Sequence, residues 1–153
     1  MLTLPELSTF HCQLTRIRET DLGNIQQIIE DKPFQTFLPD LYDLLKTEQG
    51  CKVFFSSFSK YEQEGSGLLW AIRIGDLLIG FVAIMDIPRN STIFYAIHPL
   101  YRGKGYAKEC IKAVVSWYDR NYSGHPLHTE IHECNKASLH VASCCPSICI
   151  MRK

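Results

Sequence analysis

Residues 91–107 of this chain read STIFYAIHPLYRGKGYA, and this stretch decides how the whole sequence is interpreted. The apolar run at residues 91–98 indicates a β-strand that Pro99 brings to an end. A turn with two glycines follows, and then apolar residues recur at three- and four-residue spacing over residues 105–121, as on one face of a helix. The stretch predicts a strand, a glycine-rich turn and a long helix in direct succession.

The glycine-rich turn also carries two positive charges, on Arg102 and Lys104. The first amide groups of a helix have no partner within the helix, and the helix dipole adds partial positive charge at the same end. Glycines at 103 and 105 let the backbone approach a ligand closely. We therefore expect this turn to bind an anion such as a pyrophosphate. A plain loop is the alternative, because the Walker pattern and the complete G-x-G-x-x-G are both absent.

Outward from this stretch, the chain predicts an α+β domain with a mixed, mainly antiparallel sheet. The Gly75-Asp76 pair between two apolar runs is a hairpin signal, and the strand–helix–strand crossover after residue 91 adds a parallel pair. Pro33 is expected to end the first helix. Strands are expected at residues 11–17, 68–74, 77–86, 91–98 and 127–132. Helices are expected at residues 22–30, 37–47, 52–63, 105–121 and 135–143.

The length and charge of the chain indicate a single globular domain that does not bind nucleic acid or membranes through its overall charge. The chain has 153 residues, which is the length of one domain, residues 1–153. It has 16 basic and 16 acidic residues, and this balance argues against bulk binding to nucleic acid or to an anionic membrane. No basic and apolar leader opens the chain, and no run approaches the about 18 apolar residues that span a bilayer. A cytoplasmic protein is expected.

Seven cysteines are present, an odd number without the paired spacing of a zinc site. A disulfide framework is not expected in a chain without an export signal. The sequence therefore predicts no metal site and reduced, mostly buried thiols.

Two runs of the sequence resemble a known family. The run IHPLYRGKGYAKECIKAVVSW resembles the acetyl-CoA motif of the GNAT N-acetyltransferase superfamily, [Q/R]-x-x-G-x-[G/A], which Arg102, Gly105 and Ala107 match. The run HECNKAS resembles the Asn-x-x-Ser segment of the branch that acetylates the N-termini of ribosomal proteins. The resemblance covers residues 11–143.

The resemblance implies transfer of an acetyl group from acetyl-CoA to a primary amine by direct attack in a ternary complex. It implies that the strands at 91–98 and 127–132 splay apart and that the pantetheine arm lies between them. A peptide or protein N-terminus is the first acceptor implied, and a small amine such as a polyamine is the second. The coenzyme-binding residues implied are Ile97, Arg102, Gly103, Lys104, Gly105, Tyr106, Ala107 and Asn135.

Catalytic roles follow from the same resemblance. Ser138 stands where the family often places a hydroxyl near the thiol sulfur, although a serine in a helix also bonds the backbone. Thr92 stands where the branch often has an acidic residue, so the base that deprotonates the amine stays open among Glu130, His132 and Asp86.

The C-terminus departs from the family pattern. The family usually continues into a Gly-Phe turn and two more strands, whereas this chain reads CCPSICIMRK over residues 144–153. A truncated or frameshifted end is therefore expected, with residues 143–153 as an atypical tail and the last strands missing. Such an end leaves a sheet edge open unless a second copy covers it as a homodimer. It also raises an alternative function, a catalytically degenerate acyl-CoA-binding domain.

Overall fold

The chain folds around a seven-stranded mixed sheet, which confirms the predicted α+β class; the computed structural model describes residues 3–153. The strands lie in chain order, with four antiparallel pairings followed by two parallel ones. They are β1 (Leu7–Ser8), β2 (Gln13–Arg16), β3 (Leu68–Ile74), β4 (Leu77–Met85), β5 (Thr92–Ile97), β6 (Leu127–Ile131) and β7 (Ile148–Arg152).

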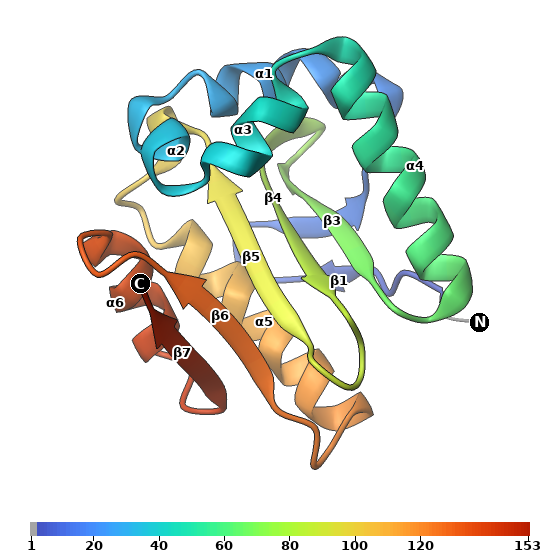
Figure 1. Ribbon diagram of the computed structural model, residues 1–153, viewed down its shortest axis with the longest axis vertical. Coiled ribbons are helices and arrows are strands. Elements are labelled where there is room, and N and C mark those ends of the chain that lie inside the picture. The colour runs from blue at the N-terminus through green and yellow to red at the C-terminus, as the bar shows by residue number, and fades with distance from the viewer. Residues whose placement is uncertain (1–2) are drawn as a thin grey trace.

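Helices cover both faces of the sheet (Figure 1). Alternate residues of β3 divide between two cores: Trp70 and Ile72 pack in the core that includes α5, and Ala71 packs in the core that includes α1 and α4. None of the helices within residues 3–153 is long and apolar enough to cross a membrane. The helices are α1 (Leu22–Ile29), α2 (Lys32–Phe37), α3 (Pro39–Leu45), α4 (Glu48–Glu64), α5 (Tyr106–Asn121) and α6 (Lys136–Ser143).

Two prolines begin helices, which corrects the sequence prediction. Pro33 was expected to end a helix, but it lies in the first turn of α2, where Asp31 caps the helix by accepting a hydrogen bond from the Phe34 amide at 3.1 Å. Pro39 is the first residue of α3, so the helix predicted over residues 37–47 begins at Pro39, and α2 precedes it as a separate helix that was not predicted. The first turn of a helix tolerates proline because the missing N–H has no partner there.

Gly80 of β4 brings that strand unusually close to β5. A Cβ atom at this position would lie 2.4 Å from the Ala96 carbonyl oxygen and 2.8 Å from Cδ1 of Ile97. Since real Cβ atoms do not approach a backbone oxygen so closely, the sequence at residue 80 fixes the spacing of the two strands.

Gly80→Ala is expected to lower the free energy of unfolding by about 1–3 kcal/mol, because β5 must move to admit the methyl group. Gly23→Ala is the matched control: Gly23 is helical with open space around its Cβ position, so the same change is expected to raise stability by up to about 1 kcal/mol. Urea denaturation measures the free energy of unfolding of both variants. If Gly80→Ala were as stable as Gly23→Ala, the close contact between β4 and β5 at Gly80 would be contradicted.

β5 and β6 form the predicted parallel pair and then separate. Their register is defined by one pair of residues, Thr92 and His128, and the strands diverge toward their C-terminal ends (Figure 1). The Thr129 hydroxyl donates to the Ile93 carbonyl at 3.0 Å, just beyond the paired residues. The splayed strands that the family resemblance implied are therefore present.

The C-terminal tail corrects a second expectation in part. Residues 143–153 were expected to leave the sheet without its last two strands, but they form one strand, β7, which pairs in parallel with β6 from Leu127 and Ile148 to Ile131 and Arg152. Ile148 is buried in the core beneath the sheet, whereas Met151 is 51% exposed on the other face. The alternating apolar residues of the tail explain why it forms a strand.

Candidate active site

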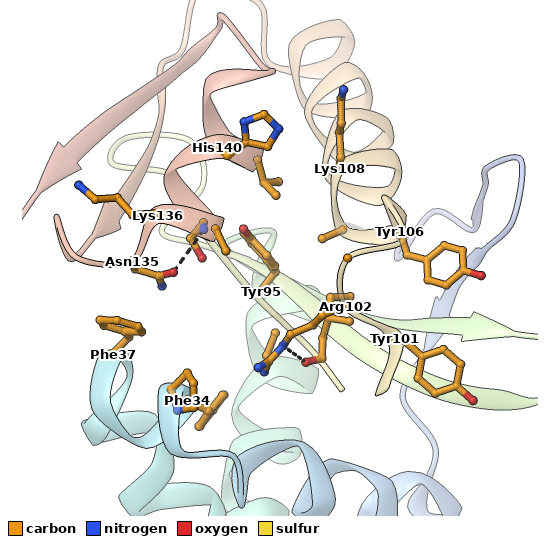
Figure 2. Close-up of a pocket in the computed structure, with 18 of the residues that line it drawn as sticks. Phe34, Phe37, Tyr95, Tyr101, Arg102, Tyr106, Lys108, Asn135, Lys136 and His140 are labelled. Atoms are coloured by element: carbon orange, nitrogen blue, oxygen red, sulfur yellow. Dashed lines mark hydrogen bonds between the residues drawn. The ribbon is translucent and has the colours of Figure 1, made fainter. Parts of the chain in front are cut away.

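A cavity of about 660 Å³ opens where β5 and β6 separate. Its walls come from α2, the C-terminal half of β5, the glycine-rich turn with the first turn of α5, and α6 (Figure 2). A cavity of this size is in the range that cofactors occupy. The turn predicted to bind an anion therefore lies on the wall of this cavity.

The cavity is positively charged although the chain as a whole is neutral. Within the described part of the chain, no residue that lines the cavity has a carboxylate. The basic groups that line it are Arg102, Lys108, Lys136 and, when protonated, His140. Such a cavity favours an anionic ligand.

The glycine-rich turn has the backbone geometry that a ligand cradle needs. Gly103 and Gly105 have φ angles of +74° and +84°, which side chains rarely adopt, and Gly105 is the N-cap of α5. No side chain caps this helix, so its first amides keep their hydrogen-bonding capacity. A Cβ atom on either glycine would meet open space, so the turn borders the cavity directly.

The Arg102 side chain also holds the glycine-rich turn in position. Its Nε donates to the Ile97 carbonyl at 3.0 Å, and its Nη1 pairs with Asp31 at 2.9 Å. The side chain therefore ties the turn to β5 and to the residue that caps α2. This long-range partner was not evident from the sequence.

The edge of β5 that faces the gap offers unpaired amides. The His98 amide donates to the Ile79 carbonyl at 2.7 Å, so His98 faces β4. Backbone groups alternate along a strand, and the amides of Ile97 and Tyr95 consequently point toward β6, where the strands have separated. These amides can pair with an extended ligand in the gap.

Asn135 and Ser138 lie on the opposite wall, at the start of α6. The Asn135 side-chain oxygen accepts a hydrogen bond from the Ser138 amide at 3.3 Å and caps the helix (Figure 2). This leaves the Asn135 amide nitrogen available to donate to a ligand. Of the eight predicted coenzyme residues, all but Lys104 line the cavity; the Lys104 ammonium lies 5.8 Å over the Tyr101 ring.

A second cavity, of about 40 Å³, adjoins the first between β5 and β6. Glu130 and His132 line only this smaller cavity, whereas Ser138 lines both. Asp86 lines neither cavity. The structure thus brings three of the four candidate catalytic residues to one region.

The candidate bases are already engaged. His132 Nδ1 accepts a hydrogen bond from the Cys134 amide at 3.1 Å, so its lone pair is in use and the ring must give up this bond before it takes a proton there. The ring also packs against Phe37, with centroids 5.6 Å apart. Glu130 is half exposed and pairs with the Lys153 ammonium at 3.0 Å.

Tyr95 is a site residue that sequence reasoning missed. It lines both cavities, and burial raises its pKa, although the nearby Ser138 side chain opposes that shift. A signal was present: Tyr95 alternates in step with Ile93 and Ile97, so its hydroxyl enters the same side of the sheet as two buried apolar residues.

The seven cysteines are free thiols. Four of them, Cys12, Cys51, Cys110 and Cys145, are buried, which agrees with the prediction that the thiols are mostly buried. Residues 3–153 contain no group of three or more histidine, cysteine or acidic side chains placed to hold a metal. Cys134 is exposed and lines the larger cavity.

Comparison with protein families matches the acetyltransferase (GNAT) domain to residues 12–145. Comparison with curated protein sequences returns no significant match.

Several solved structures share the fold. RimL, a ribosomal L7/L12 alpha-N-protein acetyltransferase solved with coenzyme A, is 17% identical with a TM-score of 0.77, covering 92% of this chain and 80% of that one. The ribosomal-protein-S5-alanine acetyltransferase from Vibrio fischeri is 16% identical with a TM-score of 0.77, covering 91% and 80%. The microcin C7 self-immunity acetyltransferase MccE, solved with acetyl-CoA and AMP, is 14% identical with a TM-score of 0.72, covering 89% and 78%.

Proposed function

The chain belongs to the GNAT acetyltransferase family, and from that membership we propose which of its residues bind and react. It is an acetyl-CoA-dependent N-acetyltransferase that moves an acetyl group from acetyl-CoA to a primary amine. One observation carries the assignment to this site. The positively charged cavity, free of carboxylates, leads from the glycine-rich turn into the gap between β5 and β6.

The coenzyme lies along this cavity in our proposal. The amides of residues 103–107 hold the pyrophosphate at the start of α5, where the helix dipole and nearby basic groups favour negative charge. The pantetheine arm enters the gap and pairs with the amides of Tyr95 and Ile97 and with the side chain of Asn135. The thioester then lies where the two cavities meet.

The reaction follows from this placement. A neutral amine in the smaller cavity attacks the thioester carbonyl, and a backbone N–H of β5 stabilises the developing oxyanion. No covalent enzyme intermediate is required. His132 and Glu130 are the proposed groups that receive the amine proton, directly or through water, once their present partners are released.

A peptide or protein N-terminus is the proposed acceptor. Two of the structures with the same fold act on ribosomal-protein N-termini or alanine, and a cavity of about 40 Å³ suits a small first residue such as serine or alanine. A small free amine is the second candidate. In this proposal residues 1–153 form a single domain that provides both the acetyl-CoA site and the acceptor site.

Calorimetry with acetyl-CoA, followed by a thiol-release assay on peptides that begin with Ser, Ala or Leu, tests the function. We expect saturable binding and turnover with the small first residues in preference to leucine. Spermidine and an aminoglycoside test the second acceptor class. Binding of acetyl-CoA without turnover on any of these amines would favour the degenerate acyl-CoA-binding domain.

Arg102→Ala is expected to weaken acetyl-CoA binding by roughly 3- to 10-fold, because the side chain positions the turn while the backbone donors remain. Arg89→Ala is the matched control: Arg89 is an exposed arginine outside both cavities, and its removal is expected to leave affinity unchanged. Calorimetric titration of both variants measures the difference, and equal affinities would remove the role given to Arg102.

A further inference from the structure

The hydrogen-bond ladder between β5 and β6 ends at Thr129. Among the described residues of the two strands, only Thr92 and His128 are paired. The His128 amide donates to the Ser91 carbonyl at 2.8 Å, as in a regular parallel ladder. One step further along, the Ile93 carbonyl accepts its hydrogen bond from the Thr129 hydroxyl at 3.0 Å. A side chain therefore takes the place of a main-chain donor at the point where the strands begin to separate.

A continued ladder would use the Glu130 amide instead. Main-chain groups that face the same neighbouring strand recur at every second residue, so the amide that follows that of His128 on this side belongs to Glu130. In a regular parallel ladder this amide would donate to the Ile93 carbonyl. The Thr129 hydroxyl occupies that acceptor, and its bond holds the strands together without pairing their main chains.

The bond between Thr129 and Ile93 is buried beside the gap. Thr129 is 5% exposed and Ile93 is 2% exposed, so water has little access to either group. A buried carbonyl that loses its donor is costly unless another donor replaces it. The Glu130 amide is the next main-chain donor of β6 that faces β5, and it is therefore the expected replacement. Thr129 also lines the smaller cavity, so the bond lies on the wall of the proposed acceptor site.

We propose that Thr129 is a positioning residue that keeps the gap between β5 and β6 open for the pantetheine arm. This inference rests on the proposed function of the site. Thr129 acts through the main chain, because its bond to the Ile93 carbonyl prevents the Glu130 amide from extending the ladder. The amides of Tyr95 and Ile97, which point toward the gap, then stay available to the arm.

Thr129→Val tests the proposal because valine has nearly the shape of threonine but no hydroxyl. We expect the Ile93 carbonyl to accept from the Glu130 amide in this variant, so that the strands pair one step further and the gap shortens. Acetyl-CoA affinity is expected to fall about 10-fold, which corresponds to the contribution of about one hydrogen bond. Adenosine 3′,5′-bisphosphate, which lacks the pantetheine arm, is expected to bind the variant and the wild type equally. Calorimetry measures both ligands, and general damage to the fold would weaken both.

Three further variants control for the hydroxyl. Thr92→Val is the matched control: the Thr92 hydroxyl also donates to a main-chain carbonyl, that of Asn90 at 3.1 Å, but this bond is exposed and Thr92 lines neither cavity. It is expected to bind acetyl-CoA like the wild type. Thr129→Ser keeps the hydroxyl and is expected to keep the affinity. Thr129→Ala lacks the hydroxyl and is expected to lose affinity for acetyl-CoA alone, which provides the same test if Thr129→Val does not fold.

The replacement bond can be observed without any ligand. Nuclear magnetic resonance detects a scalar coupling between an amide nitrogen and a carbonyl carbon that share a hydrogen bond. A coupling from the Glu130 amide to the Ile93 carbonyl is expected in free Thr129→Val and not in the wild type. The coupling from the His128 amide to the Ser91 carbonyl, whose hydrogen bond is present in the structure, is expected in both proteins and is the positive control.

Two results would overturn the role of Thr129. One is an acetyl-CoA affinity in Thr129→Val that equals that of the wild type or falls in parallel with the affinity for adenosine 3′,5′-bisphosphate. The other is a Thr129→Val spectrum that shows the coupling from the His128 amide but none from the Glu130 amide. If the wild type itself does not bind acetyl-CoA, the proposed function fails, whereas the couplings still show whether Thr129 ends the ladder.

Discussion

Gly105→Val is expected to abolish measurable acetyl-CoA binding, a loss of at least about 100-fold, while the protein still folds. At this N-cap position the new Cβ points into open space on the cavity wall, and its methyl groups fill the volume assigned to the pyrophosphate. The φ angle of +84° also strains any side chain, so some stability is lost as well. Calorimetry with acetyl-CoA measures the binding, and thermal unfolding measures the stability.

Gly124→Val separates strain from blocked binding. Gly124 has a φ of +86° and open space at its Cβ position, but it lies in the loop between α5 and β6, outside both cavities. We expect the two valine variants to lose similar stability and only Gly105→Val to lose acetyl-CoA. Retention of affinity in Gly105→Val would remove the central claim about the turn.

Arg73→Ala is expected to cause the largest loss of stability, about 3–5 kcal/mol, because it leaves the buried carboxylate of Asp21 without its partner. Two guanidinium nitrogens of Arg73 donate to the two carboxylate oxygens of Asp21, both at 2.7 Å. The two side chains are only 3% and 6% exposed. Arg73 also donates to Thr15 and to the Arg16 carbonyl, so it joins β3 to β2 and to the start of α1.

Arg16→Ala is the control for this ion pair. Arg16 makes an equally well-formed fork with Glu62, at 2.7 and 2.8 Å, but its side chain is 57% exposed. Exposed pairs contribute at most about 1 kcal/mol, so the same substitution is expected to cost little. Urea denaturation compares the two, and equal losses would show that burial does not decide the effect.

The same ion pair predicts how stability depends on pH. Burial alone would raise the pKa of Asp21, but hydrogen bonds from Arg73 and from the Arg18 amide outweigh it and lower that pKa below its ordinary value. A group whose pKa is lower in the folded state stabilises the protein above its unfolded pKa, which is about 3.9 for aspartate. The contribution is therefore complete near pH 7 and is lost as the pH falls below about 4. Urea denaturation of the wild type and Arg73→Ala, near pH 7 and well below pH 4, checks this prediction: the difference in stability between the two proteins is expected to shrink at the lower pH.

Features decided by neighbouring residues were predictable from the sequence. Gly105 and the apolar periodicity after it specify the turn and α5 within one segment, and Gly75-Asp76 specifies the hairpin. Asn135 was placed correctly at the start of α6. In each case, the physical reason lies within a few residues of the feature itself.

Features that depend on distant partners were not predictable in the same way. The sequence shows that Arg102 is basic, but not that Asp31 and the Ile97 carbonyl hold it. It shows an alternating run at residues 148–152, but not that β6 offers that run an edge. Tyr95 went unnoticed because the cavities that it lines are formed together with α6, which is distant from β5 in the sequence.

β5 and β6 are paired at one position only, Thr92 and His128, and this makes the stability of the folded chain depend on bound coenzyme. The two strands have unpaired backbone groups along the gap between them, and a bound pantetheine arm would form hydrogen bonds with these groups. A ligand that binds only the folded state adds about 2.7 kcal/mol of stability at 100 times its Kd. Amide hydrogen exchange along this seam would then slow as acetyl-CoA rises, and resistance to proteolysis would follow the supply of the coenzyme.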